Sequence, residues 1–555
     1  MTDTVARARA WLAQDPDPVT REELSALLAR VEAGEEAALV ELADRFDTRL
    51  EFGTAGLRGA LGAGPNRMNR VVVMRAAAGV AGWLGEGGAH VVIGHDARYR
   101  SADFARDSAA VLTGAGHRVF VLPEALPTPV LAFAIRALGA DAGIMVTASH
   151  NPPEDNGYKV YVGGTGDAAG AQIVSPADRE ISAAIDTVGP VGELALGKDW
   201  TVLGPEMVER YVTAITDIVP VGPRELAVVY TPLHGVGGRV LLEAMERSGF
   251  ARPRVVTEQF DPDPDFPTVA FPNPEEPGTM ATALTMGEAE GADVVIANDP
   301  DADRLAVAVP GYGQLTGDEV GGLLAEYVLA HTSGERVVAT TIVSSGLLGR
   351  IASEHGVGYE ETLTGFKWLA RAGRPGQRRV FSYEEAIGYC LGSDNGRPVS
   401  DKDGIGAALV LAALAARARR DGRTLVDLLD DQARRYGLYL NDQLSVRVED
   451  VSLLDAVMHR LRDRPPSVLG PFRVEGIDDF AGGHADLPPT DALRLRLEGK
   501  GRVTLRPSGT EPKLKAYAEV VLDVADGDVA AVRARGTSLL AELVSAADAV
   551  IRSSE

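Results

Sequence analysis

The sequence is poor in cysteine and aromatic residues and contains no long apolar run. Cys390 is the one cysteine among 555 residues, which excludes an internal disulfide and a metal site built from cysteine thiolates. No stretch of about eighteen apolar residues occurs, so we expect no membrane-spanning helix. The first residues also lack the apolar core of a signal peptide. Together these absences predict a cytoplasmic protein without a membrane partner.

Positive charge is scarce as well. The chain has 55 lysines and arginines against 79 aspartates and glutamates, which gives a net charge of −24. A field of this sign repels nucleic acids and anionic membranes, so we exclude both as partners. The same field repels a phosphorylated small molecule, and such a ligand needs a local cluster of basic side chains and backbone N–H groups. Basic residues inside loops are therefore the informative ones.

The chain is too long for a single core, which predicts three or four domains. Residues 1–50 are predicted to form a helical extension packed on the first domain, with Thr20 and Glu23 matching a capping box. Strand–helix alternation then predicts the α/β fold class: three similar α/β domains with mixed sheets covered by helices, and a smaller C-terminal α+β domain. The expected domains span residues 51–204, 205–311, 312–438 and 439–555.

A polar loop follows a short apolar run at residues 143–146. The loop reads TASHNP at 147–152, which predicts a strand feeding a sharp turn that holds a reactive side chain. Ser149 lies in mid-loop, and a serine hydroxyl is a weak nucleophile unless a base, a cation or a metal lies beside it. His150 and Lys159 are candidates for those roles. An ordinary turn is the alternative, since Thr, Ser and Asn before proline are common turn formers.

Three aspartates at alternate positions lie between two apolar strands: Asp299, Asp301 and Asp303. Carboxylates this close repel one another unless a cation lies among them. Oxygen ligands favour a hard ion, and an associated phosphate indicates Mg²⁺. An EF-hand is excluded, because Arg304 stands where glycine is needed and Pro310 occupies the twelfth position. A solvated acidic turn is the remaining alternative and fits poorly between buried strands.

Three further loops could bind a phosphorylated ligand. In GTAGLRG, residues 53–59, glycines allow the backbone to approach a ligand while Arg58 points at it; a solvated arginine on a flexible loop is the alternative. Thr364, Gly365 and Lys367 precede a predicted helix, which suits an anion site at a helix N-terminus. The turn at 506–513 suits a phosphate dianion through Arg506, Ser508, Gly509, Thr510 and Lys513, whereas a plain hairpin turn leaves its two basic residues unexplained.

Four segments occur in a fixed order along the chain: TASHNP, DPDADR at 299–304, VFSYEEAIG at 380–388, and RPSGTEPKLK at 506–515. They resemble the phosphoserine, magnesium, sugar-binding and phosphate-binding loops of the α-D-phosphohexomutase family, the phosphoglucomutases and phosphomannomutases. The resemblance covers nearly the whole chain from Gly53 onward. The variants GTAGLRG and EEAIG are most similar to the branch that includes phosphopentomutase-type members.

The resemblance implies a phosphosugar mutase that interconverts hexose 1-phosphate and hexose 6-phosphate, with glucose or mannose as the sugar. Ser149 would carry the phosphoryl group, and the reaction would pass through a bisphosphate intermediate. One Mg²⁺ per active site would be held by the three aspartates and by a phosphoryl oxygen on Ser149. A sugar bisphosphate would prime the enzyme. Reorientation of the intermediate implies a central cleft and a mobile last domain.

The resemblance also implies roles for other residues. Arg58 and Arg304 would stabilise the transferring phosphoryl group. A base must take the proton of the attacking hydroxyl, and Lys159 and His150 are both candidates, with Lys159 preferred because its segment matches the family. Two residues of the third domain would contact the substrate: Glu384, which would accept hydrogen bonds from ring hydroxyls, and Lys402, which lies in a matching lysine-containing segment.

Alternatives remain for the identity of the sugar and for the type of reaction. Ala386 stands where many hexomutases have a serine, which removes one ring contact. A phosphopentomutase acting on ribose or deoxyribose 1-phosphate is therefore the alternative. A phosphatase would have no need of the second phosphate loop, and a non-catalytic sugar-phosphate sensor would have no need of an intact Ser149 and aspartate set. We expect a monomer or a weak homodimer whose ligands are small-molecule sugar phosphates.

Overall fold

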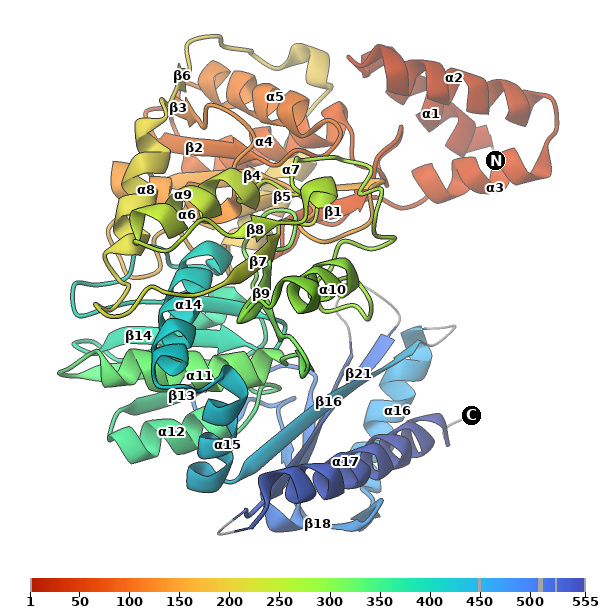
Figure 1. The fold of residues 1–555 in the computed structure, drawn as a ribbon. Coiled ribbons are helices and arrows are strands. Elements are labelled where there is room, and N and C mark those ends of the chain that lie inside the picture. The colour runs from red at the N-terminus through yellow and green to blue at the C-terminus, as the bar shows by residue number, and fades with distance from the viewer. Residues whose placement is uncertain (1, 448–450, 508–512, 525–526, 554–555) are drawn as a thin grey trace. The chain divides into compact units, whose positions relative to one another are not determined.

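The computed structural model describes residues 2–447, 451–507, 513–524 and 527–553 (Figure 1). The chain divides into two compact units. The first unit is Met1–Leu315 with Gly388–Arg419, and the second is Thr316–Ile387 with Arg420–Glu555. Within the described ranges, none of the helices combines the length and apolar character needed to span a bilayer.

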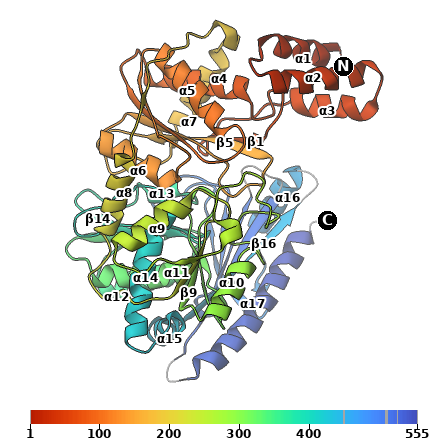
Figure 2. The same ribbon diagram turned by 45° about the horizontal axis from the view of Figure 1, so that its top comes forward.

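Three helices open the first unit and lie against one another (Figures 1 and 2): α1 (Thr2–Gln14), α2 (Pro18–Glu32) and α3 (Glu36–Phe46). The capping box expected at Thr20 and Glu23 is wrong, because both residues lie inside α2. Asp17 caps this helix instead, accepting a hydrogen bond from Val19 N at 3.0 Å. Glu23 pairs with Arg45 of α3 at 2.6 Å and so joins two of the helices.

The apolar side chains of these helices pack on helix α4 (Arg70–Leu84). Trp11 and Phe46 meet edge to face with ring centroids 6.1 Å apart, and they share one core cluster with Val71 and Met74 of α4. Burial of aromatic side chains of this size is worth about 1.5–3 kcal/mol each. The helical extension is thus part of the core of the first unit.

The first sheet of this unit has the strand order β1-β5-β4-β2-β3-β6. Strands β2, β3, β4 and β6 are parallel, and β5 is antiparallel to both β1 and β4. Because β2 and β4 are parallel, the loops that follow them leave the same edge of the sheet. The strands are β1 (Leu57–Ala60), β2 (His90–His95), β3 (Arg118–Val121), β4 (Ala142–Val146), β5 (Asp155–Val162) and β6 (Thr201–Val202); the helices are α4, α5 (Ser101–Gly114), α6 (Thr128–Leu138) and α7 (Ala177–Thr187).

A second mixed sheet has the order β11-β10-β9-β7-β8. Its strands β7, β8 and β9 are parallel, and β10 turns back antiparallel to β9 after the aspartate loop. The strands are β7 (Val228–Thr231), β8 (Arg254–Val255), β9 (Val294–Ala297), β10 (Ala306–Val309) and β11 (Gly313–Gln314), and the helices are α8 (Glu206–Thr216), α9 (Gly237–Arg247) and α10 (Ala281–Glu290). The first unit also contains β15 (Gly388–Leu391) and helix α14 (Gly404–Arg420), which begins beside the aspartate loop: a Cβ at Gly404 would lie 2.2 Å from Arg304 O.

The second unit begins with a parallel arrangement in which β12 (Arg336–Thr341) lies between β13 (Gly358–Thr362) and β14 (Arg378–Glu384). Its helices are α11 (Gly317–Ala330), α12 (Leu347–His355), α13 (Phe366–Leu369) and α15 (Leu425–Tyr436). The start of α11 is fixed by a capping box between Thr316 and Glu319.

An antiparallel sheet of order β16-β21-β20-β19-β18-β17 completes the second unit. Helix α17 packs along β16 and β21 (Figures 1 and 2). The elements are β16 (Leu438–Arg447), α16 (Val451–Asp463), β17 (Val468–Leu469), β18 (Phe472–Asp479), β19 (Leu493–Leu497), β20 (Arg502–Pro507), β21 (Lys513–Leu522) and α17 (Val529–Arg552).

Candidate active site

Ser149 lies in the loop after the fully buried strand β4 and is itself 1% exposed. Its φ of 52° is left-handed, which is uncommon for a residue with a side chain, and its N–H donates to Thr147 Oγ1 at 2.8 Å. The Ser149 hydroxyl donates to Asp299 Oδ2 at 2.8 Å and lies 3.2 Å from His150 Nδ1. The sharp turn therefore fixes the hydroxyl between a carboxylate and an imidazole.

Arg98, which the sequence did not single out as a site residue, holds this loop in place. Its guanidinium donates to four backbone carbonyl oxygens: Ser149 at 2.7 Å, Pro152 at 2.7 Å, Asp155 at 3.1 Å, and Asn151. Arg98 is 5% exposed and also pairs with Asp96 at 3.5 Å. Arg98 could have been found from its position just after β2, because β2 is parallel to β4 and the loops after parallel neighbours leave the same edge of the sheet.

The three aspartates of the loop after β9 are all buried. Asp299, Asp301 and Asp303 each offer an oxygen, and these atoms lie within 4.8 Å of one another. Burial raises the pKa of Asp299 well above its ordinary value, and the two neighbouring carboxylates add to this. Burial would also raise the pKa of Asp301, but the Lys159 ammonium, together with hydrogen bonds from Lys159, Thr128 and Asp299, leaves that pKa below the ordinary value.

The donor set fits a hard divalent cation. Oδ1 of Asp301 and Oδ1 of Asp303 are buried and accept no hydrogen bond from any described residue. A buried carboxylate oxygen without a partner is costly, and coordination of an ion would satisfy it. Oxygen-only ligands at this spacing suit Mg²⁺.

Two lysines offset part of this negative charge. Lys159 on β5 pairs with Met145 of β4. Because β5 runs antiparallel to β4, this pairing places Lys159 near the end of β4, where the loop of Ser149 begins. Its Nζ donates to Asp301 Oδ2 at 2.9 Å and lies 3.4 Å from Asp303 Oδ2. Lys402 Nζ lies 3.3 Å from the same Asp303 oxygen. Lys402, predicted to contact substrate, thus has its ammonium group beside the aspartate loop.

Arg58 contacts the loop of Ser149, and Arg304 ends the aspartate loop. Arg58 donates to Asn151 Oδ1 at 2.9 Å. Arg304 donates its backbone N–H to Asp299 Oδ1 at 3.0 Å, and its guanidinium lies 3.2 Å from Glu275 Oε2. Both guanidinium groups therefore have partners on residues that the sequence did not single out.

His150 is placed to act as a neutral imidazole. Burial lowers its pKa well below 6.5, and the positive charges of Arg304 and Arg58 lower it further. A neutral ring 3.2 Å from the Ser149 hydroxyl is able to accept its proton.

The second unit contains the predicted sugar-binding loop. Glu384 ends β14 and is buried, and its neighbour Glu385 accepts hydrogen bonds from Ser344 Oγ at 2.8 Å and Thr341 Oγ1 at 3.1 Å. Glu385 therefore braces the loop on which Glu384 lies. Glu385 is a positioning group that sequence reasoning missed.

The other predicted residues of this unit lie at two turns. Gly365 has φ of 110° and precedes the short helix α13, with Thr364 and Lys367 on either side; Thr364 Oγ1 is buried without a hydrogen-bond partner among the described residues. Arg506 is near the end of β20 and Lys513 begins β21. Ser508, Gly509 and Thr510 lie outside the described residues.

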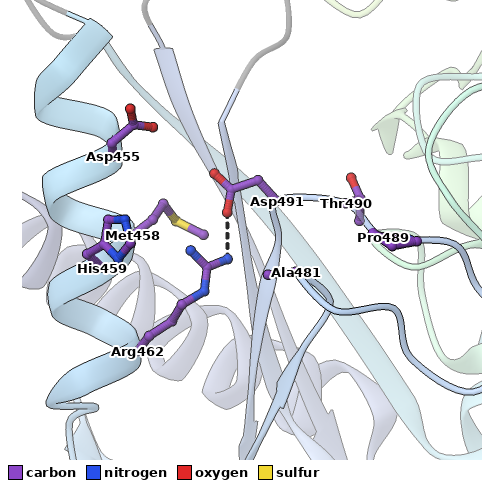
Figure 3. Close-up of a pocket in the computed structure, with 8 residues that line it drawn as sticks. All are labelled: Asp455, Met458, His459, Arg462, Ala481, Pro489, Thr490 and Asp491. Atoms are coloured by element: carbon purple, nitrogen blue, oxygen red, sulfur yellow. Dashed lines mark hydrogen bonds and ion pairs between the residues drawn. The ribbon is translucent and has the colours of Figure 1, made fainter.

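A hollow of about 380 Å³ in the C-terminal part of the second unit contains none of the predicted residues (Figure 3). Arg462 crosses it and donates to Asp491 Oδ1 at 2.5 Å. Since Arg462 also pairs with Asp479 at 3.1 Å, its guanidinium is engaged on two sides, and the hollow adds nothing to the candidate site.

The chain matches known families along most of its length. Residues 49–191, 209–313, 316–436 and 446–536 match, in turn, the phosphoglucomutase/phosphomannomutase alpha/beta/alpha domains I, II and III and the C-terminal domain of that family. The four matches confirm the predicted fold class of three α/β domains followed by a smaller one.

Individual relatives agree. A "probable phosphomannomutase" of Haemophilus influenzae is 42% identical over 461 residues, which cover 81% of this chain and 93% of that protein. A "probable phosphoribomutase" of Schizosaccharomyces pombe is 34% identical over 557 residues, covering 91% and 92%. The crystal structure of a "putative phosphomannomutase" from Thermus thermophilus aligns with a TM-score of 0.71 at 25% identity, covering 91% of this chain and 99% of that one.

The domain matches include every loop from which the site is built, and the two relatives cover 81% and 91% of the chain. The chain therefore belongs to the phosphoglucomutase/phosphomannomutase family and is a phosphomutase, an isomerase of the phosphoryl-transferring type.

Proposed function

We propose that this protein interconverts the 1-phosphate and 6-phosphate of glucose or mannose, with Ser149 as the carrier of the phosphoryl group. The observation that carries the proposal is the 2.8 Å hydrogen bond from the Ser149 hydroxyl to Asp299, within the buried aspartate cluster. A phosphoryl group on this hydroxyl would lie beside carboxylates able to bind a hard cation.

Asp299, Asp301 and Asp303 would hold Mg²⁺ together with an oxygen of the phosphoryl group on Ser149. When bound, the ion withdraws charge from the group that is transferred. The two partnerless carboxylate oxygens support this assignment.

Arg58 and Arg304 would donate hydrogen bonds to the oxygens of the transferring group. The Arg58 guanidinium donates to Asn151 of the loop of Ser149, and the charges of both guanidinium groups lower the pKa of His150. Planar donors of this kind match phosphoryl oxygens in pairs. Arg98 would not touch the substrate. Its role would be to hold the carbonyl groups of the loop so that Ser149 keeps its left-handed turn.

In the first half of the reaction, the free hydroxyl oxygen of the sugar phosphate attacks the phosphorus. The bond from phosphorus to Ser149 Oγ breaks, the sugar hydroxyl proton passes to a base, and the base returns a proton to the leaving Ser149 Oγ. We assign the base to Lys159 in its neutral amine form, with His150, whose imidazole is already neutral, as the alternative. In the second half, the base takes the Ser149 hydroxyl proton as Oγ attacks the other phosphate of the bisphosphate, and the released sugar oxygen takes that proton from the base.

The bisphosphate must turn between the two halves, so its two ends must be recognised alike. Glu384 would accept hydrogen bonds from ring hydroxyls, and the turn of Arg506, Ser508, Gly509, Thr510 and Lys513 would bind the phosphate that is not reacting. Thr364, Gly365 and Lys367 offer a further anion contact, and Lys402 would act through Asp303. A sugar bisphosphate would prime the unphosphorylated enzyme.

A phosphopentomutase is the second candidate. Ala386 supports it, because a methyl group two positions after Glu384 offers no hydrogen bond to a ring hydroxyl. The name of the Schizosaccharomyces pombe relative supports it as well. The same Ser149 chemistry would then act between the 1-phosphate and 5-phosphate of ribose or deoxyribose.

The test compares kcat/KM for glucose 1-phosphate, mannose 1-phosphate and ribose 1-phosphate, with Mg²⁺ and a sugar bisphosphate present. Preference for a hexose supports the first candidate, and preference for ribose 1-phosphate supports the second. A chelator should stop turnover, and added Mg²⁺ should restore it. Release of inorganic phosphate without isomerisation would indicate a phosphatase, and binding without turnover of any sugar would indicate a sensor.

A further inference from the structure

The proline-rich segment 261–278, which connects η2 (Thr257–Gln259) to α10, lies against the residues around Ser149. Sequence patterns predict no regular structure here, and none of the roles proposed above uses it. Three of its side chains contact the site. The Phe266 ring centroid lies 4.9 Å from Arg98 Cζ, and the Phe271 ring meets the His150 ring edge to face at 6.1 Å. Glu275 Oε2 lies 3.2 Å from Arg304 Nη1. The segment therefore contacts Arg98, which holds the loop of Ser149, and the candidate base His150. It also contacts Arg304, which is proposed to bind the phosphoryl group.

The position of Glu275 is fixed from within its own domain. Asn273 is buried, and its Oδ1 accepts the N–H of Glu275 at 3.2 Å. The next carbonyl back, Pro274 O, accepts a hydrogen bond from Gln314 Nε2 at 2.8 Å. Proline also fixes φ on both sides of this turn. Glu275 is thus presented to the site by a rigid turn and not by a loose loop.

Arg304 is fixed at its backbone and adjustable at its tip. The N–H donates to Asp299 Oδ1 at 3.0 Å and the carbonyl oxygen accepts from Asn298 Nδ2 at 2.7 Å, so the main chain is held on both sides. Acidic neighbours of the guanidinium among the described residues include Glu275 at 3.2 Å and Asp303 at 3.8 Å. Its orientation therefore depends on which anion attracts it most strongly.

A phosphoryl group on Ser149 would be a third anion near this guanidinium. It carries about two negative charges and three acceptor oxygens, whereas Glu275 carries one charge and two oxygens. The side chains of Arg304 and Glu275 are 15% and 24% exposed, so water screens their attraction only in part. The guanidinium should consequently exchange between the two anions.

We propose that Glu275 is a positioning residue for Arg304, holding the guanidinium while Ser149 is a free hydroxyl and releasing it when a phosphoryl group occupies the site. This inference rests on the proposed function, because a phosphoryl group must reach Ser149. The ion pair between Glu275 and Arg304 must break before Arg304 can bind a phosphoryl group, and the free energy this requires weakens phosphoryl binding. The phosphorylated sugar is therefore bound less tightly than it would be without Glu275. Glu275 thereby favours release of the bisphosphate for reorientation and of the product.

The test uses Glu275→Gln, which keeps the shape and removes the charge. Glu276→Gln is the matched control, because the next residue is exposed and its side chain is in none of the contacts described. Glu275→Gln should lower kcat and KM together, each by roughly threefold to tenfold, while Glu276→Gln changes neither. A rise in KM, or equal behaviour of the two variants, would overturn the proposal.

A double-mutant cycle on phosphate affinity distinguishes an effect of Glu275 that acts through Arg304 from a direct effect of its negative charge on the phosphate. It does not require the enzyme to turn over. Inorganic phosphate is titrated calorimetrically into the Mg²⁺-loaded wild type, Glu275→Gln, Arg304→Ala and the double variant. Glu275→Gln should tighten phosphate binding by roughly threefold to tenfold, and this gain should vanish in the Arg304→Ala background. The same gain in both backgrounds would mean a field effect and would overturn the proposal.

The two readouts also separate this inference from the proposed function. A wild-type protein that turns over no sugar phosphate contradicts the proposed function, and the phosphate cycle still decides the role of Glu275. Melting temperatures are recorded for all variants. If Arg304→Ala does not fold, Arg304→Lys takes its place, because lysine keeps the charge but loses the planar pair of donors.

Discussion

Lys159 Nζ lies 2.9 Å from Asp301 Oδ2, and both side chains are buried. The two residues belong to segments matched by family domains I and II, so this ion pair joins strand β5, which follows the loop of Ser149, to the aspartate loop. A second donor, Thr128 Oγ1, reaches the same oxygen at 2.7 Å. Ser149 and the proposed cation site are therefore built as one buried polar cluster.

Replacement of Lys159 tests how far this cluster depends on its cation. Lys159→Met leaves Asp301 and Asp303 without their ammonium partner, and loss of one member of a buried pair costs about 3–5 kcal/mol. We expect a lower free energy of unfolding by urea denaturation and no measurable turnover. Lys159→Arg should recover most of the stability but not the turnover if Lys159 is the base. Full activity of Lys159→Arg would transfer that role to His150.

Replacement of Arg98 tests the clamp on the phosphoserine loop. Lysine cannot reach four carbonyl oxygens, so Arg98→Lys should leave Ser149 misplaced and lower kcat/KM by about a hundredfold. The unfolding free energy should fall by about 1–3 kcal/mol, because buried carbonyl groups lose their donor. Arg106→Lys, at an exposed arginine of α5, is the control. Normal activity of Arg98→Lys would show that the turn holds without the clamp.

Two glycines of the GTAGLRG loop should respond differently to alanine. Gly56 has φ of 77°, and a Cβ there would lie 1.8 Å from Tyr158 O, whereas a Cβ at Gly53 would meet nothing within 4 Å. Gly56→Ala should push β1 away from β5 and displace Arg58, lowering kcat/KM by at least about tenfold. Gly53→Ala should change unfolding free energy by no more than about 0.5 kcal/mol. Equal activity of the two variants would contradict the close approach of β1 and β5.

The pH dependence of stability should show the titration of Asp318. Burial raises the pKa of Asp318 to about 7, opposed by hydrogen bonds from Ser345 N and Tyr383 Oη, both at 2.7 Å. In the unfolded chain the pKa of such a carboxyl is about 3.9, so between these values the folded protein keeps a proton that the unfolded chain has lost. Stability from this group is therefore complete below about pH 4 and decreases as the pH rises toward 7.

Asp318→Asn mimics the protonated form and should remove this dependence. At pH 8 the variant should exceed the wild type in unfolding free energy by roughly 2–4 kcal/mol, and the two should converge near pH 4. Urea unfolding at a series of pH values measures both curves. Parallel curves for the two proteins would show that Asp318 titrates normally.

Local patterns were sufficient to predict the residues that carry chemistry on their own loops. Ser149 and the three aspartates lie in loops that follow short apolar strands, β4 of one sheet and β9 of another, and such loops are common places for reactive side chains. The order of four loops also predicted the family and fold class correctly. These features are encoded by neighbours in the sequence.

The supporting residues could not be predicted in this way. Arg98 lies 51 positions from Ser149 and Glu275 lies 29 from Arg304, and no local pattern relates the members of either pair. The helix start in the N-terminal extension shows the same limit: Thr20 and Glu23 match a capping box, but Glu23 pairs with Arg45 on the next helix. Tertiary contacts decided these positions, and only the folded chain contains them.

The central claim is that Ser149 carries the phosphoryl group, and phosphopeptide mapping tests it most directly. The protein is incubated with glucose 1,6-bisphosphate and Mg²⁺, mapped, and then chased with glucose 1-phosphate. We expect one phosphoryl group on Ser149, which the chase transfers to the sugar to give a bisphosphate. A Ser149→Ala variant should be neither labelled nor active. A label on another residue, or full turnover by Ser149→Ala with bisphosphate present, would contradict it.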